Sequence, residues 1–190
     1  MDRICVFCGS SNGFDKEIPK QATLLGQKMA QSKIDLVYGG TDVGLMGKVA
    51  NAVLKGGGDV VGVIPEFIKA FKLAHENLTE LILVQTMHER KAKMAELSDG
   101  FIALPGGFGT LEELFEVLTM SQLSLHHKPI ALLNVNGYFD DLISLMNNMV
   151  EKGFLQQVNM DMLIVSDDIE ELIEKMNLYR PAEAKKWKIN

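Results

Sequence analysis

The segment LPGGFGTLEE, residues 104–113, combines a glycine-rich turn with two carboxylates. Glycines allow a backbone to approach a ligand closely and to expose its N–H groups, and a helix N-terminus adds partial positive charge. We therefore predict that Gly106, Gly107 and Gly109, with the hydroxyl of Thr110, bind a phosphate. The segment is neither a G-x-G-x-x-G nor a G-x-x-x-x-G-K-[ST] fingerprint, so a glycine turn without a ligand stays the alternative.

Glu113 allows two interpretations. It could act as a catalytic carboxylate, or it could complete a capping box with Thr110, in which the Glu side chain accepts a hydrogen bond from the N–H of the cap residue. Apolar periodicity predicts a helix over residues 111–122 whose sheet-facing stripe leaves Glu113 on the opposite side. That stripe comprises Leu111, Leu114, Phe115 and Leu118.

The side of this helix that carries Glu113 is also apolar, because it contains Val117, Met120 and Leu123. A helix with two apolar faces needs to bury both of them. Most soluble oligomers are symmetric, and homodimers are the commonest, so we expect a second copy of the chain to cover the outer face. Glu113 would then lie beside an interface crevice.

Arg90 lies among apolar residues in the helix that is predicted to begin near residue 86. It shares a helical face with Met87, Met94 and Leu97, and Lys91 lies at the edge of that face. A guanidinium is seldom buried without a partner, so we expect Arg90 to contact a carboxylate, a phosphate or both. The alternative is an arginine stem that covers apolar surface while its head stays in solvent.

Two further turns contain small residues where a predicted strand ends. Ser10 lies in CGSSNG after the first strand, and Gly39, Gly40 and Gly44 lie in YGGTDVGLMG after the second. We predict that these residues form further walls of the ligand site, since ligands bind at the carboxyl ends of strands in open α/β sheets. Glycines that only shape a tight turn are the alternative.

Apolar, β-branched runs alternate with helical patterns along the chain. This alternation predicts an α/β, Rossmann-like three-layer fold with a mainly parallel sheet flanked by helices. We assign residues 1–180 to a single nucleotide-binding domain and residues 181–190 to a C-terminal tail. The predicted strands are 4–8, 35–40, 59–64, 80–84, 100–107, 128–135 and 162–166. The predicted helices are 18–32, 45–55, 87–98, 111–122, 138–152 and 168–176, and Thr86 with Glu89 predicts a capping box at the start of the third.

The chain has 190 residues, a net charge of -6 and a sequence pI of about 5.2. This acidic balance argues against a nucleic-acid partner. No apolar run is long enough to span a membrane and the N-terminus lacks the features of a secretory signal, so we expect a cytoplasmic protein without a membrane partner. Cys5 and Cys8 have C-x-x-C spacing, but they face opposite sides of an extended strand and no second pair exists, so we predict no metal site.

The stretches CGSS, YGGTDVGLMG, MHERKAKMAELSDGFIALPGGFGTLEELFEVLT and KPIALLNVNGYFDDLI resemble the LOG (lonely guy) family of cytokinin riboside 5'-monophosphate phosphoribohydrolases. The P-G-G-x-G-T-x-x-E hallmark of that family is complete, from Pro105 to Glu113. The resemblance implies a Rossmann-like homodimer that hydrolyses the N-glycosidic bond of adenosine-type nucleoside 5'-monophosphates. It implies neither a metal nor an organic cofactor.

The resemblance also assigns roles to individual residues. The catalytic arginine of the family corresponds to Arg90, and the catalytic glutamate corresponds to Glu113. The glycine loop and Thr110 would hold the nucleotide phosphate. Further candidates for substrate binding are Lys91, Glu112 and Thr119.

The implied chemistry needs few groups. Departure of adenine leaves an oxocarbenium-like sugar, and a nearby carboxylate can stabilise the positive charge or activate water. Glu113 is the predicted carboxylate, whereas Arg90 could neutralise the phosphate, orient Glu113 or assist the leaving base. Met120 and Ser121 stand where relatives commonly have Trp-Ala, and the choice between AMP and N6-prenylated AMP stays open.

Two other functions stay open beside the hydrolase. A lysine decarboxylase would need pyridoxal phosphate and a Schiff-base lysine, and no lysine lies among the convergent turns. A non-catalytic carrier would use the same loops to bind a phosphorylated pterin-type cofactor without turnover. The presence of both Arg90 and Glu113 favours the hydrolase over the carrier.

Overall fold

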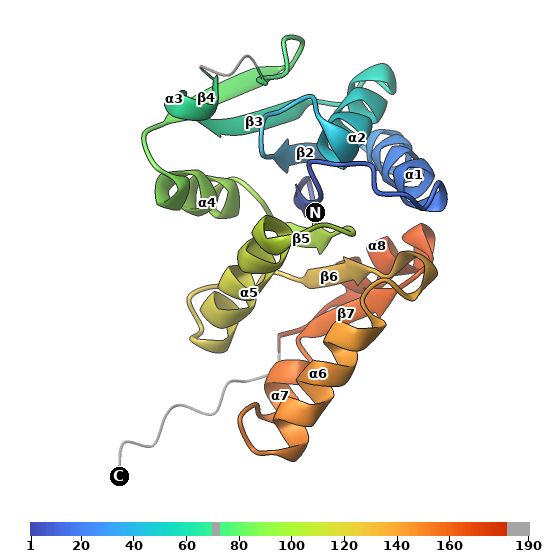
Figure 1. The fold of residues 1–190 in the computed structure, drawn as a ribbon, viewed down its shortest axis with the longest axis vertical. Coiled ribbons are helices and arrows are strands. Elements are labelled where there is room, and N and C mark those ends of the chain that lie inside the picture. The colour runs from blue at the N-terminus through green and yellow to red at the C-terminus, as the bar shows by residue number, and fades with distance from the viewer. Residues whose placement is uncertain (70–72, 182–190) are drawn as a thin grey trace.

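The computed structural model describes residues 1–69 and 73–181 and contains a seven-stranded sheet (Figure 1). The strands are β1 (Arg3–Phe7), β2 (Asp35–Tyr38), β3 (Val60–Pro65), β4 (Glu80–Val84), β5 (Gly100–Ala103), β6 (Ile130–Leu133) and β7 (Leu163–Ser166). Their order is β4-β3-β2-β1-β5-β6-β7, and every neighbouring pair is parallel. All seven predicted strands are therefore present. The predicted tail, residues 181–190, lies outside the described residues apart from its first residue.

Six long helices match the six predicted from periodicity, and three shorter elements join them. The helices are α1 (Glu17–Gln31), α2 (Gly44–Lys55), α3 (Glu66–Lys69), α4 (Met87–Glu96), α5 (Phe108–Gln122), α6 (Asp140–Glu151), α7 (Gln157–Met160) and α8 (Ile169–Leu178), with a 3-10 turn η1 (Val135–Gly137). Neither the one-turn helices nor the 3-10 turn was predicted. Among the described residues, no helix combines the length and the hydropathy that a membrane span requires.

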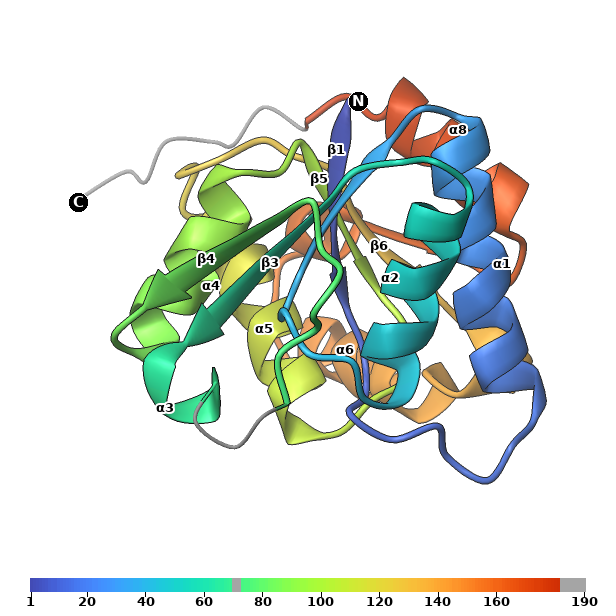
Figure 2. The same cartoon turned by 90° about the horizontal axis from the view of Figure 1, so that it is seen from above.

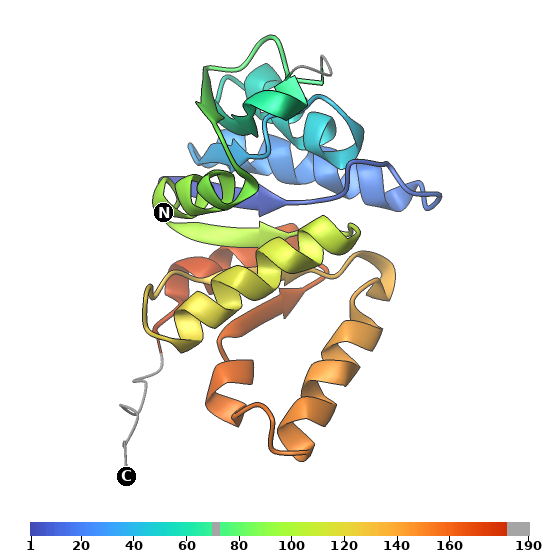
Figure 3. The ribbon, with the colours of Figure 1, turned by 60° about the vertical axis from the view of Figure 1, so that its left-hand side comes forward.

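Helices cover both faces of the sheet, which confirms the three-layer fold (Figure 2, Figure 3). Side chains of α1, α2 and α8 share one apolar cluster with one face of the sheet, and side chains of α4, α5 and α6 share another cluster with the other face. Successive residues of β1 alternate between them, so Cys5 and Cys8 belong to opposite clusters, as predicted. Both cysteines are free thiols.

The centre of the sheet is where the order of strands reverses. β1 pairs with β2 on one side and with β5 on the other, and Ile4 lies opposite Gly100. The loop after β1 therefore lies beside the loop after β5, and the N–H of Gly9 donates to the carbonyl of Pro105 at 3.0 Å. Such a topological switch point is where ligands bind in open parallel sheets. The fold thus brings two of the predicted ligand loops together.

Candidate active site

A cleft of about 270 Å³ lies at the carboxyl ends of β1 and β5, beside the N-terminus of α5. Its walls come from the loop after β1, the first turn of α2, the start of α4, and the glycine turn that leads into α5. The predicted site residues that line it are Ser10, Arg90, Gly107, Gly109, Thr110, Glu112 and Glu113. The cleft therefore brings the glycine turn and both predicted catalytic residues together.

The start of α4 fixes the position of its cleft-facing side chain. Thr86 is the N-cap residue, and its hydroxyl accepts a hydrogen bond from the N–H of Glu89 at 3.1 Å. The Glu89 carboxylate accepts a hydrogen bond from the N–H of Gln85 at 2.8 Å, one residue before the cap. The predicted capping box is thus present with its return bond shifted by one residue. Arg90 follows one turn after the cap and is buried.

Arg90 and Glu113 form a buried ion pair. Nη1 of Arg90 donates to Oε1 of Glu113 at 2.7 Å, and each side chain is only 10% exposed. Nε of Arg90 donates to the carbonyl oxygen of Val63, in β3, at 3.1 Å. The expectation that Arg90 contacts a carboxylate is confirmed. Each charged group offsets the cost of burying the other. An isolated charge at this depth would have no such partner.

The predicted start of α5 is wrong. The helix begins at Phe108, three residues earlier than predicted, with the extended Gly107 as its N-cap residue. Thr110 therefore lies inside the first turn, and the capping box between Thr110 and Glu113 does not form. The physical reason is that glycine has low helix propensity, so Gly109 gave no indication of a helix in the sequence.

The predicted orientation of α5 is also wrong. Glu113 is not on the side opposite the sheet, because it is buried with Leu114 and Val117 on the inner side. The apolar pattern of the helix places a charged glutamate on the solvent side, whereas the ion pair with Arg90 allows Glu113 to be buried. The other members of the predicted stripe are only partly buried: Leu111, Phe115 and Leu118.

The cleft combines the N-terminus of a helix with a perturbed carboxyl group. Burial raises the pKa of Glu113 above its ordinary range, and the Arg90 guanidinium opposes that rise. A carboxyl group with a raised pKa is a better proton acceptor near neutral pH. The first turn of α5 has no acidic residue, and the first N–H groups of a helix have no partners within it. Burial also raises the pKa of the Cys8 thiol, so Cys8 lines the cleft as a neutral group.

The three glycines of the turn differ in their surroundings. A Cβ atom on Gly106 would overlap the side chain of Thr110 and lie 2.9 Å from the nitrogen of Gly9, so packing requires this glycine. A Cβ atom on Gly107 or Gly109 would have no described atom within 4 Å, and neither residue has a positive φ. Packing and a left-handed backbone therefore do not explain glycine at these two positions, whereas the close approach of a ligand would.

The predicted glycines after β2 lie behind the cleft and do not line it. Gly39 packs against Arg90, and Gly40 has a φ of +75°. Gly44, with a φ of +55°, lies against the backbone of Ser10. These glycines allow neighbouring segments to approach each other, and their predicted contact with a ligand stays a prediction.

Lys91 and Thr119 also lie outside the lining of the cleft. Lys91 is buried between α4 and α5, where it pairs with Glu112 and, at 3.2 Å, with Glu116. The hydrogen bond to Glu112 raises the pKa of Lys91. Thr119 is exposed, and its hydroxyl donates to the carbonyl of Phe115 at 2.7 Å. The predicted contacts of both residues with a nucleotide stay predictions.

Some residues of the lining were not predicted as site residues. Met46 and Met87 are in the first turns of α2 and α4, and Phe108, the first residue of α5, is 93% exposed. Each follows a turn that ends a strand, and that position was the available indication in the sequence. The unpredicted lining residues are Cys8, Gly9, Met46, Met87 and Phe108.

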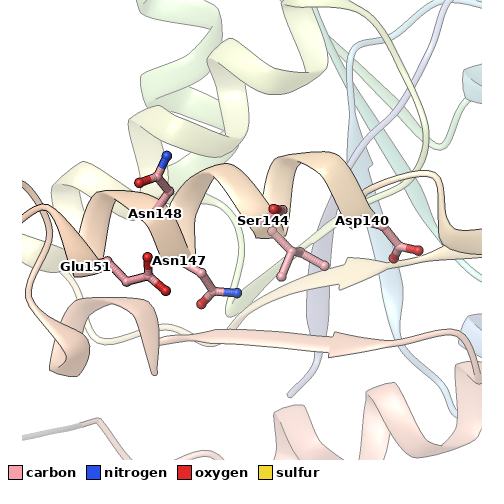
Figure 4. A pocket seen from close by; sticks show the side chains of 6 residues that line it. Asp140, Ser144, Asn147, Asn148 and Glu151 are labelled. Atoms are coloured by element: carbon pink, nitrogen blue, oxygen red, sulfur yellow. The ribbon is translucent and has the colours of Figure 1, made fainter.

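A second hollow, of about 600 Å³, lies along α6 (Figure 4). All of its lining residues belong to that one helix, and none of them lines the cleft at β1 and β5. Its lining contains neither a glycine nor a cationic side chain, so the cleft is the better candidate for an active site. The lining residues of the hollow are Asp140, Ile143, Ser144, Asn147, Asn148 and Glu151.

Sequence comparisons identify the family of the chain. A family model with the description "Possible lysine decarboxylase" matches residues 46–176. The probable cytokinin riboside 5'-monophosphate phosphoribohydrolase LOGL2 of Oryza sativa subsp. japonica is 46% identical over 192 residues, which cover 98% of this chain and 79% of the relative. The chain belongs to the LOG family. Another LOG family member, the cytokinin riboside 5'-monophosphate phosphoribohydrolase LOG3 of Arabidopsis thaliana, is 47% identical over 179 residues, covering 94% of this chain and 83% of the relative.

Solved structures share the fold at lower sequence identity. The molybdenum cofactor binding protein from the phototrophic bacterium Rippkaea orientalis has a TM-score of 0.71 and 24% identity, covering 93% of this chain and 95% of that chain. The Moco carrier protein from Chlamydomonas reinhardtii has a TM-score of 0.69 and 20% identity, with the same shares of each chain. At these identities the likeness shows the fold alone. The assignment to the LOG family depends on the sequence matches.

Proposed function

We propose that this protein hydrolyses the N-glycosidic bond of adenosine-type nucleoside 5'-monophosphates, AMP or N6-prenylated AMP, to a free base and ribose 5-phosphate. The observation that carries the proposal is the buried Arg90–Glu113 pair, in a cleft that also contains the glycine turn and the N-terminus of α5. The names of the LOG family relatives agree with this class of reaction.

The phosphate would bind at the start of α5. Gly107 and Gly109 leave open space there, and the hydroxyl group of Thr110 belongs to a residue of the same lining. Exposed N–H groups and the helix dipole favour a dianion at this position. Ser10, from the loop after β1, would add a hydroxyl group from the neighbouring wall.

Glu113 would act on the sugar. As the bond between C1' and the base nitrogen breaks, positive charge develops on the ribose, and an adjacent carboxylate stabilises it. Water adds its oxygen to C1', and Glu113 accepts the proton that the water releases. The base leaves with the electron pair of the broken C–N bond and receives that proton from Glu113, so that one water is consumed and the carboxylate is restored. Arg90 would orient the carboxylate through the 2.7 Å hydrogen bond and direct positive charge toward the phosphate.

The proposal is tested by incubating the purified protein with AMP and, separately, with N6-isopentenyl-AMP. Chromatography should detect free base together with ribose 5-phosphate, and the ratio of rates would identify the better substrate. Glu113→Gln should abolish base release while circular dichroism shows an intact fold. Glu116→Gln is the matched control, because Glu116 is on the same helix but outside the cleft, and it should retain activity.

Two other outcomes would overturn the proposal. Tight binding of a phosphorylated pterin-type cofactor without base release would favour the carrier function. Visible absorbance from bound pyridoxal phosphate would favour a decarboxylase, although none of the described residues that line the cleft is a lysine.

We also propose that the protein acts as a homodimer in the cytoplasm. α4 and α5 lie on the same face of the sheet (Figure 3). Met87 of α4 is 39% exposed, and Leu123 and Leu125, just after α5, are 49% and 67% exposed. Exposed apolar side chains on α4 and just after α5 favour a protein partner. Light scattering should give the mass of two chains, and the mass of one chain would contradict this proposal.

A further inference from the structure

Two nitrogens of the Arg90 guanidinium donate hydrogen bonds, and the third lies against a residue without a side chain. Nε donates to Val63 and Nη1 donates to Glu113, at 3.1 Å and 2.7 Å. Nη2 has no hydrogen bond to any of the described residues and lies against Gly39, which directly follows β2. The contact joins the second strand to a helix that is far along the chain.

Gly39 provides the space that Nη2 occupies. A Cβ atom on this residue would overlap Nη2, and it would lie 3.2 Å from Cζ of Arg90 and 3.1 Å from Sδ of Met46. Overlap of this kind is strongly repulsive, so one of the two groups would have to move. Gly39 belongs to the buried backbone at the end of β2, whereas Nη2 is the end of a flexible side chain, so the group that moves is the guanidinium.

The backbone of Gly39 gives no other reason for glycine. Gly40 and Gly44 have positive φ values of +75° and +55°, but Gly39 does not. A left-handed backbone, the usual reason for glycine, therefore does not apply to Gly39. What excludes a side chain at this position is therefore the guanidinium of Arg90 with the sulfur of Met46.

We propose that Gly39 is a positioning residue for Arg90. Its missing side chain lets the guanidinium approach the end of β2 closely enough to donate to Val63 and Glu113 at the same time. The inference deepens the proposed function, because it identifies what sets the position of the catalytic arginine. The inference rests on the proposed function only for the test that measures turnover.

Gly39→Ala should displace the guanidinium of Arg90 without unfolding the protein. The atom that an added methyl group meets is the end of a long, flexible side chain, so the protein can fold with the guanidinium displaced. The expected change is local: the hydrogen bonds from Nε and Nη1 lengthen or break. Gly58→Ala is the matched control. Gly58 also lacks a positive φ, and a Cβ atom there would lie 2.9 Å from Cγ1 of Val53, away from the cleft.

NMR of the arginine Nε–H groups in the isotope-labelled free protein tests the inference without a substrate. The chain has three arginines, so the signal of Arg90 can be assigned by its loss in Arg90→Ala. A buried, hydrogen-bonded Nε–H exchanges slowly with water, and Gly39→Ala should shift its signal and speed its exchange. Gly58→Ala should leave it unchanged. An Arg90 signal that is the same in Gly39→Ala and in the wild-type protein would overturn the inference.

Turnover provides a second test. Gly39→Ala should lower kcat by at least about tenfold, because a small misplacement of a catalytic group strongly reduces the rate. The same substitution made in Arg90→Ala should change kcat by less than about twofold, since Gly39 acts through Arg90. An equal loss in both backgrounds would overturn the inference. If the wild-type protein releases no base, the proposed function fails and the NMR comparison alone decides the role of Gly39.

Discussion

Replacement of Arg90 by methionine would turn a buried ion pair into a buried, unpartnered carboxyl group. The side chains of Arg90 and Glu113 are each 10% exposed, so water has little access to replace the lost guanidinium. Methionine has a similar length and no charge, so the space stays filled. In Arg90→Met, Glu113 must either stay ionised without a partner or take up a proton. The loss in the free energy of unfolding should therefore depend on pH.

The size of this dependence follows from the ordinary pKa of glutamate, 4.5. Protonating such a group costs about 3.4 kcal/mol at pH 7 and about 0.7 kcal/mol at pH 5, at about 1.36 kcal/mol per pH unit. Removal of Arg90 takes away the interaction that lowers the pKa of Glu113, so its pKa in the folded protein rises further above the unfolded value. Stability is then lost as pH rises above 4.5 toward the folded pKa. The lost hydrogen bond to Val63 contributes equally at both pH values.

Urea denaturation of the wild-type protein and Arg90→Met at pH 5 and at pH 7 measures this effect. We expect the destabilisation to be larger at pH 7 by between about 1 and about 3 kcal/mol. The double variant Arg90→Met/Glu113→Gln has no titrating carboxyl group at this position, so its difference in stability from Arg90→Met should change between pH 5 and pH 7 in favour of the double variant. Equal destabilisation of Arg90→Met at pH 5 and pH 7 would show that Glu113 does not take up a proton when it loses its partner.

Three further predictions concern contacts around the cleft. Tyr138→Phe removes the hydroxyl that donates to the carbonyl of Gly106 at 2.6 Å. It should raise the KM for the nucleotide about threefold in initial-rate assays, and an unchanged KM would contradict this prediction. Thr86→Ala removes the N-cap of α4 and should lower the Tm by about 2–4 °C in calorimetry, so an unchanged Tm would disagree. Lys91→Met removes a buried ammonium group from carboxylates that are 56% and 36% exposed, so it should lower the Tm by less than Thr86→Ala, and a larger loss in calorimetry would contradict this.

The order of the elements could be predicted because helices cover both faces of the sheet. Covered strands are nearly continuous apolar runs, such as residues 130–133, and the helices between them are amphipathic. The ends of strands and the starts of helices were less predictable where glycine and proline follow a strand. The strand predicted over residues 100–107 ends at Ala103, and helix α5 begins at Phe108. The helices α3 and α7 have one turn each, which is too short for periodicity to indicate.

The site could be predicted in part. Arg90 was detectable because a charged residue interrupts an apolar helical face, and the glycine turn was detectable from its composition. The orientation of α5 was not, because it depends on an ion pair between two helices that periodicity does not include. The contact of Gly39 with a distant arginine was not detectable either, since such a glycine has the same local sequence as a glycine that shapes a turn.

The pairing of β1 with β5 also has a consequence for how the protein folds. Ile4 lies opposite Gly100, so the two loops that form the cleft meet only when the ends of a long intervening chain have been brought together. Such distant pairings form slowly, because chain closure has to precede the contacts that stabilise it. Nucleotide binding should therefore return late during refolding, after most of the helical circular dichroism. A nucleotide that binds only the completed sheet would stabilise the folded protein, and above its Kd this stabilisation would grow with the logarithm of its concentration.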